Sequence, residues 1–151
     1  MQRLNYIKAS PRPFEHLSTL SRYFHDCGFP GGLLELVWLR ASQLNGCAYC
    51  TDMHVADALK LGEAPRRLHL IAAWREANLY SPAERAALAW TEAVTNVQDG
   101  HVPDHVFEGL KPHFDERQIA DLTYAIATIN AWNRLAVAFR VPLPDTPAGV
   151  R

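Results

Sequence analysis

The stretch Gly46-Cys47-Ala48-Tyr49-Cys50-Thr51-Asp52-Met53-His54 places two cysteines three residues apart and a histidine four residues after the second. On an α-helix, steps of three and four residues return to the same face. Cys47, Cys50 and His54 are therefore expected to share one stripe of a helix. A thiol pair with an imidazole beside it is typical of a redox centre that carries its own base.

The two residues before Cys47 affect the reactivity that we expect of this cysteine. Asn45-Gly46 is expected to break the preceding helix, so that Cys47 lies at the N-terminus of a new one. Unpaired backbone N–H groups at that position favour the thiolate, which is the reactive form of cysteine. An irregular first turn also brings Cβ atoms close enough for a disulfide, which residues three apart in a regular helix do not reach.

A carboxylate precedes the cysteine pair in an apolar run. Glu35 lies within residues 33–39, and Trp38 and Leu39 follow it at helical spacing. On such a partly apolar face a carboxylate can take part in proton exchange. Most glutamates instead lie on a solvated helix face. The residues alone leave both interpretations of Glu35 open.

The rest of the chain also has helical periodicity. Proline and glycine separate segments in which apolar residues recur every three or four positions, and no segment shows the alternation of a strand. Ser81-Pro82-Ala83-Glu84 is a capping box, and Asp115 is a further expected cap. We expect one all-α domain over residues 1–151, a helical bundle of about six to seven helices with a loose tail over 142–151. The expected helices cover residues 14–27, 32–44, 47–62, 66–74, 82–97, 104–110 and 115–139.

Composition excludes several classes of function. The net charge of −1 gives no electrostatic reason to expect nucleic acid or an anionic membrane as a partner. No apolar run approaches the roughly 20 residues that span a bilayer, and residues 1–8 lack the apolar core of a signal peptide. We therefore expect a cytoplasmic protein. Three cysteines are too few for a disulfide scaffold and suit redox or metal chemistry in a reducing compartment.

Other interpretations of the cysteines remain open. The thiols could be small buried apolar groups. Alternatively, Cys47, Cys50 and His54 could hold structural zinc with Cys27 as a fourth ligand, although such ligands usually come from two separated knuckles. Cys27 itself is expected to be a buried or incidental cysteine. We expect no metal and no cofactor.

Two amides and a guanidinium interrupt the apolar pattern of residues 115–139. Asn130, Asn133 and Arg134 would be costly to bury without partners. An internal hydrogen-bond network or a subunit contact is expected. The alternative is that Asn130 or Arg134 lines the thiol pocket.

Glu35, Cys47, Cys50 and His54 together form the pattern E-x11-C-x2-C-x3-H. This spacing resembles the alkylhydroperoxidase D-like family, part of the carboxymuconolactone decarboxylase superfamily. The resemblance is strong over residues 33–62 and weaker over 115–139. One departure is Tyr49, since the best-studied form of the family carries a histidine beside the second cysteine.

The resemblance implies an all-α bundle that assembles into dimers, trimers or hexamers. It implies reduction of organic hydroperoxides by the Cys47–Cys50 pair, through a sulfenic acid and then a disulfide. Glu35, His54 and bound water would relay protons, and an external dithiol, thioredoxin-like or lipoyl, would restore the pair. Alternatives are a disulfide reductase or isomerase that uses the same pair, and a non-enzymatic structural or zinc-binding assembly module.

The order of the two cysteines stays open at this point. Proximity to His54 favours Cys50 as the attacking thiol and Cys47 as the resolving one. The expected position of Cys47 at a helix N-terminus favours the reverse order.

Overall fold

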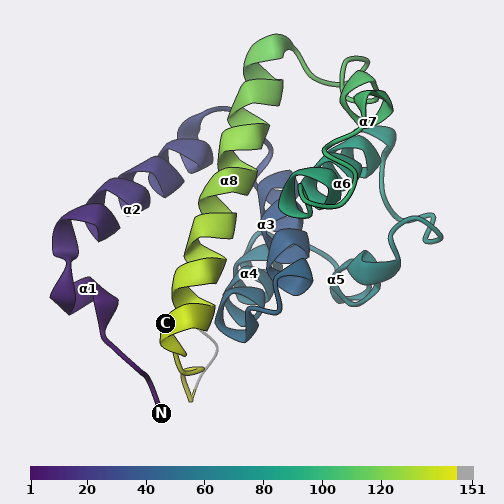
Figure 1. Cartoon of the computed structure of the whole chain (residues 1–151). Helices are drawn as coiled ribbons and strands as arrows, with labels where there is room; N and C mark the ends of the chain where they lie inside the picture. The colour runs from purple at the N-terminus through teal and green to yellow at the C-terminus, as the bar shows by residue number, and fades with distance from the viewer. Residues whose placement is uncertain (146–151) are drawn as a thin grey trace.

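The computed structural model describes residues 1–145, and in this part of the chain every regular element is helical (Figure 1). The all-α fold class is thereby confirmed. The helices are α1 (Tyr6–Ala9), α2 (Pro11–Asp26), α3 (Gly31–Leu44), α4 (Ala48–Lys60), α5 (Pro65–Leu70), the 3₁₀ turn η1 (Ile71–Ala73), α6 (Pro82–Thr95), α7 (Asp104–Glu108) and α8 (Glu116–Phe139).

Local sequence signals set most helix boundaries. The Ser81 and Asp115 side chains each accept a hydrogen bond from the backbone N–H three residues on, and both capping boxes are complete. Helix α8 ends at Phe139, and the next residue, Arg140, adopts the left-handed conformation with φ of 52°. The expected starts of α6 and α8 are confirmed.

The N-terminal region differs from the expectation. Helix α2 begins at Pro11, three residues before the expected start at Phe14, and the short helix α1 was not expected. Pro11 and Pro13 lie in the first turn of α2, where a missing N–H costs nothing. Asn5 caps α1 by accepting a hydrogen bond from the Lys8 N–H at 3.0 Å.

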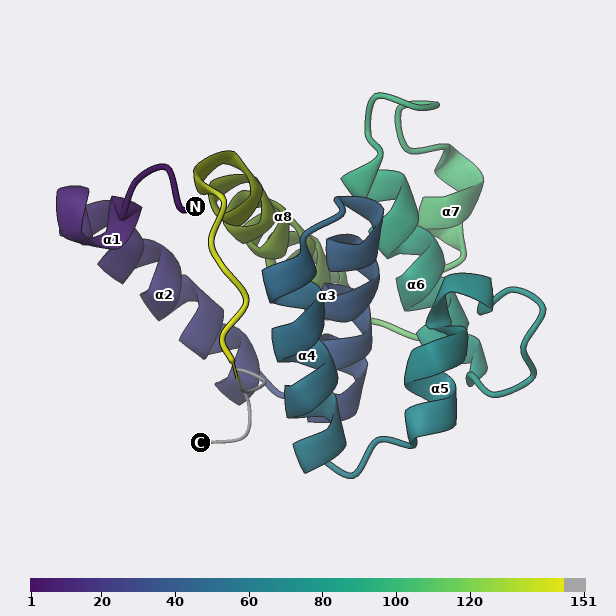
Figure 2. The ribbon, with the colours of Figure 1, turned by 90° about the horizontal axis from the view of Figure 1, so that it is seen from below.

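Helix α3 lies at the centre of the molecule. It packs against α4, α6 and α8 (Figure 2). Its residues 33–39 are all buried, because the apolar run faces partners on every side. One hydrophobic cluster joins α3 to α8, and a second joins α3 to α5, η1 and α6.

Helices α1 and α2 form an N-terminal arm along α8, on the side away from α5, α6 and α7 (Figure 1). The Arg3 N–H donates to the Phe139 carbonyl at 2.9 Å, and the Tyr6 and Phe139 rings stack at 5.4 Å. Further along the arm, the Trp132 indole N–H donates to Ser21 Oγ at 2.9 Å. The arm is thus fixed to α8 at two separate levels.

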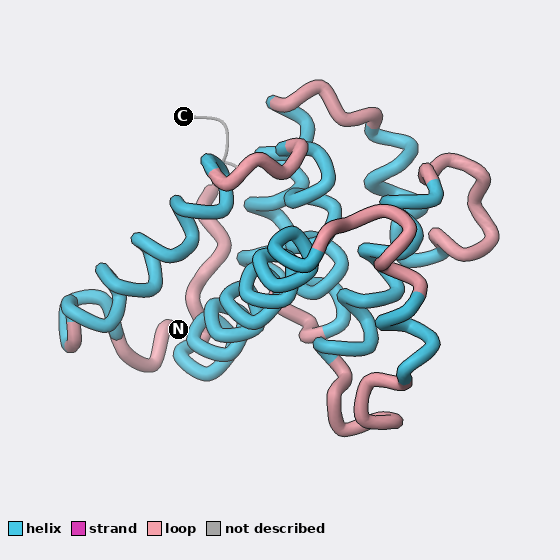
Figure 3. The backbone as a smooth tube through the Cα atoms, turned by 90° about the horizontal axis from the view of Figure 1, so that it is seen from above, coloured by secondary structure: helices cyan, strands magenta, loops and turns pink. Residues whose placement is uncertain are grey.

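Loops connect the helices, and no strand occurs within residues 1–145 (Figure 3). After α8 the chain runs back between α2 and α4 (Figure 2). Val141 packs against the main hydrophobic cluster there. Of the tail expected to be loose, residues 146–151 lie outside the described part. No helix in residues 1–145 is long and apolar enough to cross a membrane.

Candidate active site

The turn between α3 and α4 places the first cysteine. Gly46 has φ of +65°, a conformation that favours glycine, and it turns the chain after Asn45. Cys47 then occupies the N-cap of α4, and its Sγ accepts a hydrogen bond from the Cys50 N–H at 3.3 Å. The expected helix break is confirmed, and it leaves a sulfur where a capping oxygen would normally lie.

The two cysteines of the motif are bonded to each other. Cys47 and Cys50 form a disulfide with a Cα–Cα distance of 5.4 Å, and each residue is 2% exposed. Both cysteines belong to the main hydrophobic cluster, but Cys50 also lines a cavity beside α4 and Cys47 does not. A ligand in that cavity would therefore meet Cys50 first.

Glu35 and His54 form a buried pair. Helices α3 and α4 pack side by side, and this brings Glu35 Oε2 within 2.8 Å of His54 Nδ1. The two residues are 3% and 4% exposed, so the interpretation of Glu35 as a solvated surface residue is wrong. With the ring proton on Nδ1, Glu35 Oε2 accepts the Nδ1–H bond and orients the ring, which leaves Nε2 as the atom available for proton transfer.

His54 Nε2 is buried and has no hydrogen-bond partner among the described residues. A buried polar atom without a partner is costly in a folded protein, and such atoms often mark a site that a ligand or water completes. Because His54 lines the same cavity as Cys50, this atom is available to exchange protons with a molecule held there.

The cavity has a volume of about 460 Å³. Cys50, His54 and Glu35 lie in its α3–α4 wall, and α8 and the N-terminal arm form the rest of its lining. Most of the lining is apolar, and the aromatic residues among it are Tyr6, Phe14, Trp38, Tyr49 and Trp132. The disulfide and the buried pair therefore share one ligand-sized space.

Three aromatic rings are in contact with one another at this cavity. Trp38 lies between His54, at 5.3 Å between centroids, and His25 on the arm, at 5.2 Å. The Trp38 indole N–H donates to the Ala125 carbonyl at 3.2 Å, which fixes the ring. Trp38 thus packs against the His54 imidazole with its own ring held in place.

The polar residues of α8 belong to a separate internal network. Asn45 Nδ2 donates to Asn133 Oδ1 at 2.8 Å and to Asn130 Oδ1 at 3.0 Å. Asn133 in turn donates to Ser42 Oγ at 3.0 Å, and Arg134 donates to Asn130 Oδ1 at 2.8 Å. The expectation of an internal network is confirmed, and neither Asn130 nor Arg134 lines the cavity.

The zinc interpretation finds no arrangement to support it in the described residues. No group of three His, Cys, Asp or Glu side chains within residues 1–145 is placed to hold a metal ion. Cys27 is half-buried, and its thiol donates to the Phe24 carbonyl at 3.3 Å. It packs against the main hydrophobic cluster.

Sequence reasoning missed the contribution of the arm to the cavity. Tyr6, Phe14 and Ser21 line it from α1 and α2, although they lie 26 or more residues before Cys47 in the sequence. Burial raises the pKa of Tyr6, and the neighbouring Tyr49 raises it further. No periodicity or motif signals these contacts, because they arise from the docking of α1 and α2 on α8.

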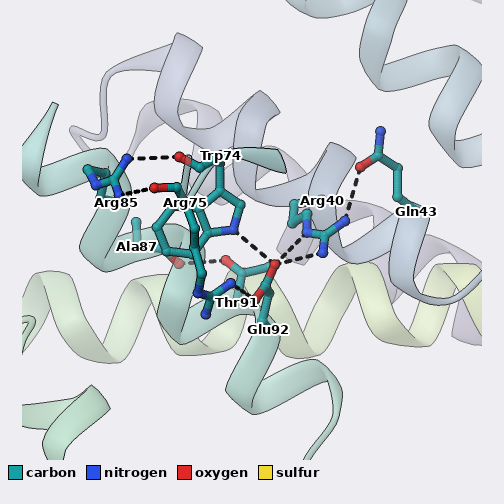
Figure 4. Close-up of polar contacts among 8 residues, drawn as sticks. All are labelled: Arg40, Gln43, Trp74, Arg75, Arg85, Ala87, Thr91 and Glu92. Atoms are coloured by element: carbon teal, nitrogen blue, oxygen red, sulfur yellow. Dashed lines mark hydrogen bonds and ion pairs between the residues drawn. The ribbon is translucent and has the colours of Figure 1, made fainter. Parts of the chain in front are cut away.

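A second polar cluster joins α3, the segment after η1, and α6 (Figure 4). Glu92 accepts hydrogen bonds from Arg40 Nε at 2.7 Å and Trp74 Nε1 at 2.9 Å, and it also pairs with Arg75. Arg85 donates to the backbone carbonyls of Trp74 and Arg75. The contacts of Glu92 and Arg85 join α3, α6 and the segment after η1.

The pKa of Glu92 reflects these contacts. Burial acts to raise it, but hydrogen bonds from Trp74, Arg75 and Arg40 together with the Arg40 charge outweigh burial. The pKa of Glu92 therefore lies below its ordinary value, and the carboxylate is ionised at neutral pH.

Comparisons with known proteins agree with this fold. Residues 11–93 match the carboxymuconolactone decarboxylase family, and the chain belongs to that family. A crystal structure from Agrobacterium tumefaciens, of a protein of unknown function described as a candidate antioxidant defence protein AhpD, superposes with a TM-score of 0.93. It is 41% identical and the match covers 97% of this chain and 100% of that one. The fold is therefore AhpD-like.

Two relatives extend the comparison. The uncharacterised protein YdfG of Bacillus subtilis (strain 168) is 38% identical over 137 residues, covering 91% of this chain and 93% of the relative. The uncharacterised protein YnjA of Escherichia coli (strain K12) is 31% identical over 108 residues, covering 72% of this chain and 59% of the relative.

Proposed function

We propose that this protein is a dithiol peroxidase that reduces organic hydroperoxides. The observation that carries the proposal is the opening of one cavity onto both Cys50 and the Glu35–His54 pair. The proposal takes Cys50 as the nucleophile, His54 as its base and Glu35 as the group that orients the base, and the Glu35–His54 hydrogen bond beside the shared cavity supports these roles. Membership of the family and the AhpD-like fold support the same chemistry.

In the first step the reduced pair meets a hydroperoxide. His54 Nε2 takes the proton of Cys50, and the thiolate attacks the terminal oxygen of the hydroperoxide. The O–O bond breaks, the alkoxide leaves as the alcohol with the proton returned by His54, and Cys50 becomes a sulfenic acid. We assign the attack to Cys50 because it lines the cavity and Cys47 does not.

In the second step the pair closes. The Cys47 thiolate attacks the Cys50 sulfur, the S–S bond forms, and hydroxide leaves as water after taking a proton. Two thiols have then supplied the two electrons that converted ROOH to ROH and water. An external dithiol of the thioredoxin-like or lipoyl kind would restore both thiols by exchange.

The decisive test is a thiol count on fully reduced protein before and after one equivalent of cumene hydroperoxide. The proposal expects a rapid fall from three free thiols to one, Cys27 being the survivor, and no such fall in Cys50→Ser. In Cys47→Ser, a sulfenic acid on Cys50 is expected, which a dimedone adduct detects by mass spectrometry.

Other outcomes would favour the alternatives. Three thiols that persist with hydroperoxide would overturn the peroxidase proposal. If the same protein then exchanged rapidly with a small disulfide, the disulfide reductase or isomerase interpretation would replace it. Full dithiol-driven peroxidase activity in Cys47→Ser would exclude the two-cysteine scheme.

A further inference from the structure

The cavity beside Cys50 is much larger than the smallest peroxide. Hydrogen peroxide is about the size of two water molecules and fills roughly 60 Å³. The cavity has a volume of about 460 Å³, within the range of pockets that enclose ligands of drug size. A small peroxide would leave most of this space to water, whereas a hydroperoxide with a bulky organic group would fill it.

The lining is suited to an apolar, ring-shaped group. Phe14 on the arm and Trp132 on α8 both line the cavity and meet edge to face, with ring centroids 5.5 Å apart. The hydrogen bond from the Trp132 indole to Ser21 fixes that ring before any ligand arrives. Aromatic rings bind other rings in offset or edge-to-face geometry, so a preset pair of rings favours an aromatic guest.

The surface of the cavity is mostly apolar, although polar and charged side chains, Arg22 and Asp57 among them, also line it. His54 Nε2 has no hydrogen-bond partner among the described residues, and it belongs to the wall that also carries Cys50. Phe14 and Trp132 come from the other walls, formed by the arm and α8. A ligand with a polar peroxide head and an apolar body therefore finds a match for each part.

We propose that Phe14 and Trp132 determine substrate specificity by binding the aromatic group of an aryl-alkyl hydroperoxide while its peroxide head faces Cys50. This inference rests on the proposed peroxidase function for the reaction, but the binding itself does not require turnover. The arm is then part of the substrate site, and its docking on α8 creates the selectivity.

The test separates binding from chemistry. Cumyl alcohol, the unreactive product of cumene hydroperoxide reduction, is titrated into the disulfide form of the protein by calorimetry. Saturable binding is expected in the wild type and a loss of at least about fivefold in affinity in Phe14→Ala, with a smaller loss in Phe14→Leu. Phe107→Ala is the matched control, because Phe107 is a partly exposed ring on α7 that does not line the cavity.

Kinetics supply the second readout. In the wild type, kcat/KM should be higher for cumene hydroperoxide than for hydrogen peroxide, and the ratio should fall at least about fivefold in Phe14→Ala but not in Phe107→Ala. Absence of cumyl alcohol binding, or equal binding by wild type and both Phe14 variants, would overturn the inference. Binding without thiol loss on hydroperoxide addition would instead overturn the peroxidase proposal and retain the cavity as an aromatic-ligand site.

Discussion

At the scale of single residues, the site depends on one imidazole held from two sides. Glu35 fixes His54 through Nδ1, and Trp38 packs against the ring. A ring constrained in this way presents Nε2 in one direction, and a positioned base is more effective than a mobile one. The roles of these residues in turnover are therefore open to substitution tests.

Removing the imidazole should suppress the chemistry. His54→Ala is expected to lower peroxidase kcat/KM by about 100-fold or more, because Cys50 loses its base. The pH at which iodoacetamide alkylates half of the Cys50 thiol should also move upward. His69→Ala, which changes an exposed histidine on α5, should leave both measurements unchanged. An unaltered alkylation profile in His54→Ala would remove His54 from the mechanism.

Neutralising the Glu35 carboxylate should lower the turnover rate less than removing the His54 imidazole does. Glu35→Gln keeps the shape of the side chain but no longer stabilises the imidazolium that forms when His54 takes a proton. Turnover is expected to fall by at least about tenfold, with the helical circular dichroism spectrum retained. Glu15→Gln on the exposed face of α2 is the control. Wild-type rates in Glu35→Gln would leave the pair a structural role only.

Sequence spacing predicted part of this site. The motif brought Cys47, Cys50 and His54 together because they share one helix. Glu35 lies 19 residues before His54, and the direction of its side chain depends on how α3 packs against α4. Periodicity within a single helix does not contain that information, so both interpretations of Glu35 stood until the packing was known.

At the scale of elements, the α3–α4 turn is clamped to α8. Asn45 immediately precedes Gly46, and its side chain binds Asn130 and Asn133 together. Since the turn carries the disulfide, these amides fix the position of the cysteines relative to the longest helix. The buried polar residues of α8 therefore position the site without lining it.

Loss of this clamp should be measurable as lost stability. Asn133 is fully buried, accepts from Asn45 and donates to Ser42. Asn133→Ala removes the buried donor to Ser42 Oγ and one of the two acceptors of Asn45 Nδ2, so the free energy of unfolding in urea should fall by about 1 to 3 kcal/mol. Asn78→Ala, at an exposed loop position, should change it little. Equal stability of the two variants would mean that water molecules replace the hydrogen bonds of Asn133 to Asn45 and Ser42.

Helix boundaries were predictable where side chains signal them locally. Ser81 and Asp115 each cap a helix by binding the backbone N–H three residues later in the chain. The residue types that make such a local contact can be recognised in the sequence. The early start of α2 was not predictable from the sequence, because prolines at 11 and 13 suit a first helical turn as well as a loop. The pattern of apolar residues became clear only from Phe14 onward.

At the scale of the whole molecule, Glu92 links α6 both to α3 and to the segment after η1. It binds Arg40 of α3, on the central helix, and both Trp74 and Arg75 of the segment after η1 (Figure 4). Trp74 belongs to the second hydrophobic cluster. A change in the charge of Glu92 should therefore weaken the packing of one side of the molecule.

The pH dependence of stability follows from the lowered pKa of Glu92. Because its pKa is lower in the folded than in the unfolded protein, the unfolded state binds the proton first as the pH falls. The stabilisation is complete above the unfolded value of about 4.5 and is lost as the pH falls through the folded pKa. Urea unfolding measured from pH 7 down to pH 3 should show a declining free energy of unfolding below about pH 5.

Glu92→Gln should remove part of that decline. At pH 7 the variant is expected to be less stable than the wild type by about 1 to 3 kcal/mol, since the charged acceptor is lost. The gap should narrow at acid pH, where the wild-type carboxylate also becomes protonated. Glu76→Gln, an exposed change in the same segment, is the control. A gap that is constant with pH would show that packing, not charge, sets the difference.

The cavity is a property of the whole molecule and was beyond sequence reasoning for that reason. Its walls come from α1, α2, α3, α4 and α8, which span nearly the full length of the described chain. Within its own segment, no lining residue of the N-terminal arm or α8 is distinguished by a motif or by its spacing. Only the docking of α1 and α2 on α8 brings Phe14, Tyr6 and Trp132 to the cavity that Cys50 also lines.

The position of Cys47 at the helix start has a consequence for how the protein passes between its two oxidation states. In the disulfide form its sulfur already accepts the Cys50 N–H. A reduced Cys47 sulfur can accept the same N–H bond, and a thiolate there would be the stronger acceptor at a helix start. We therefore expect the first turn of α4 to stay helical when the disulfide opens.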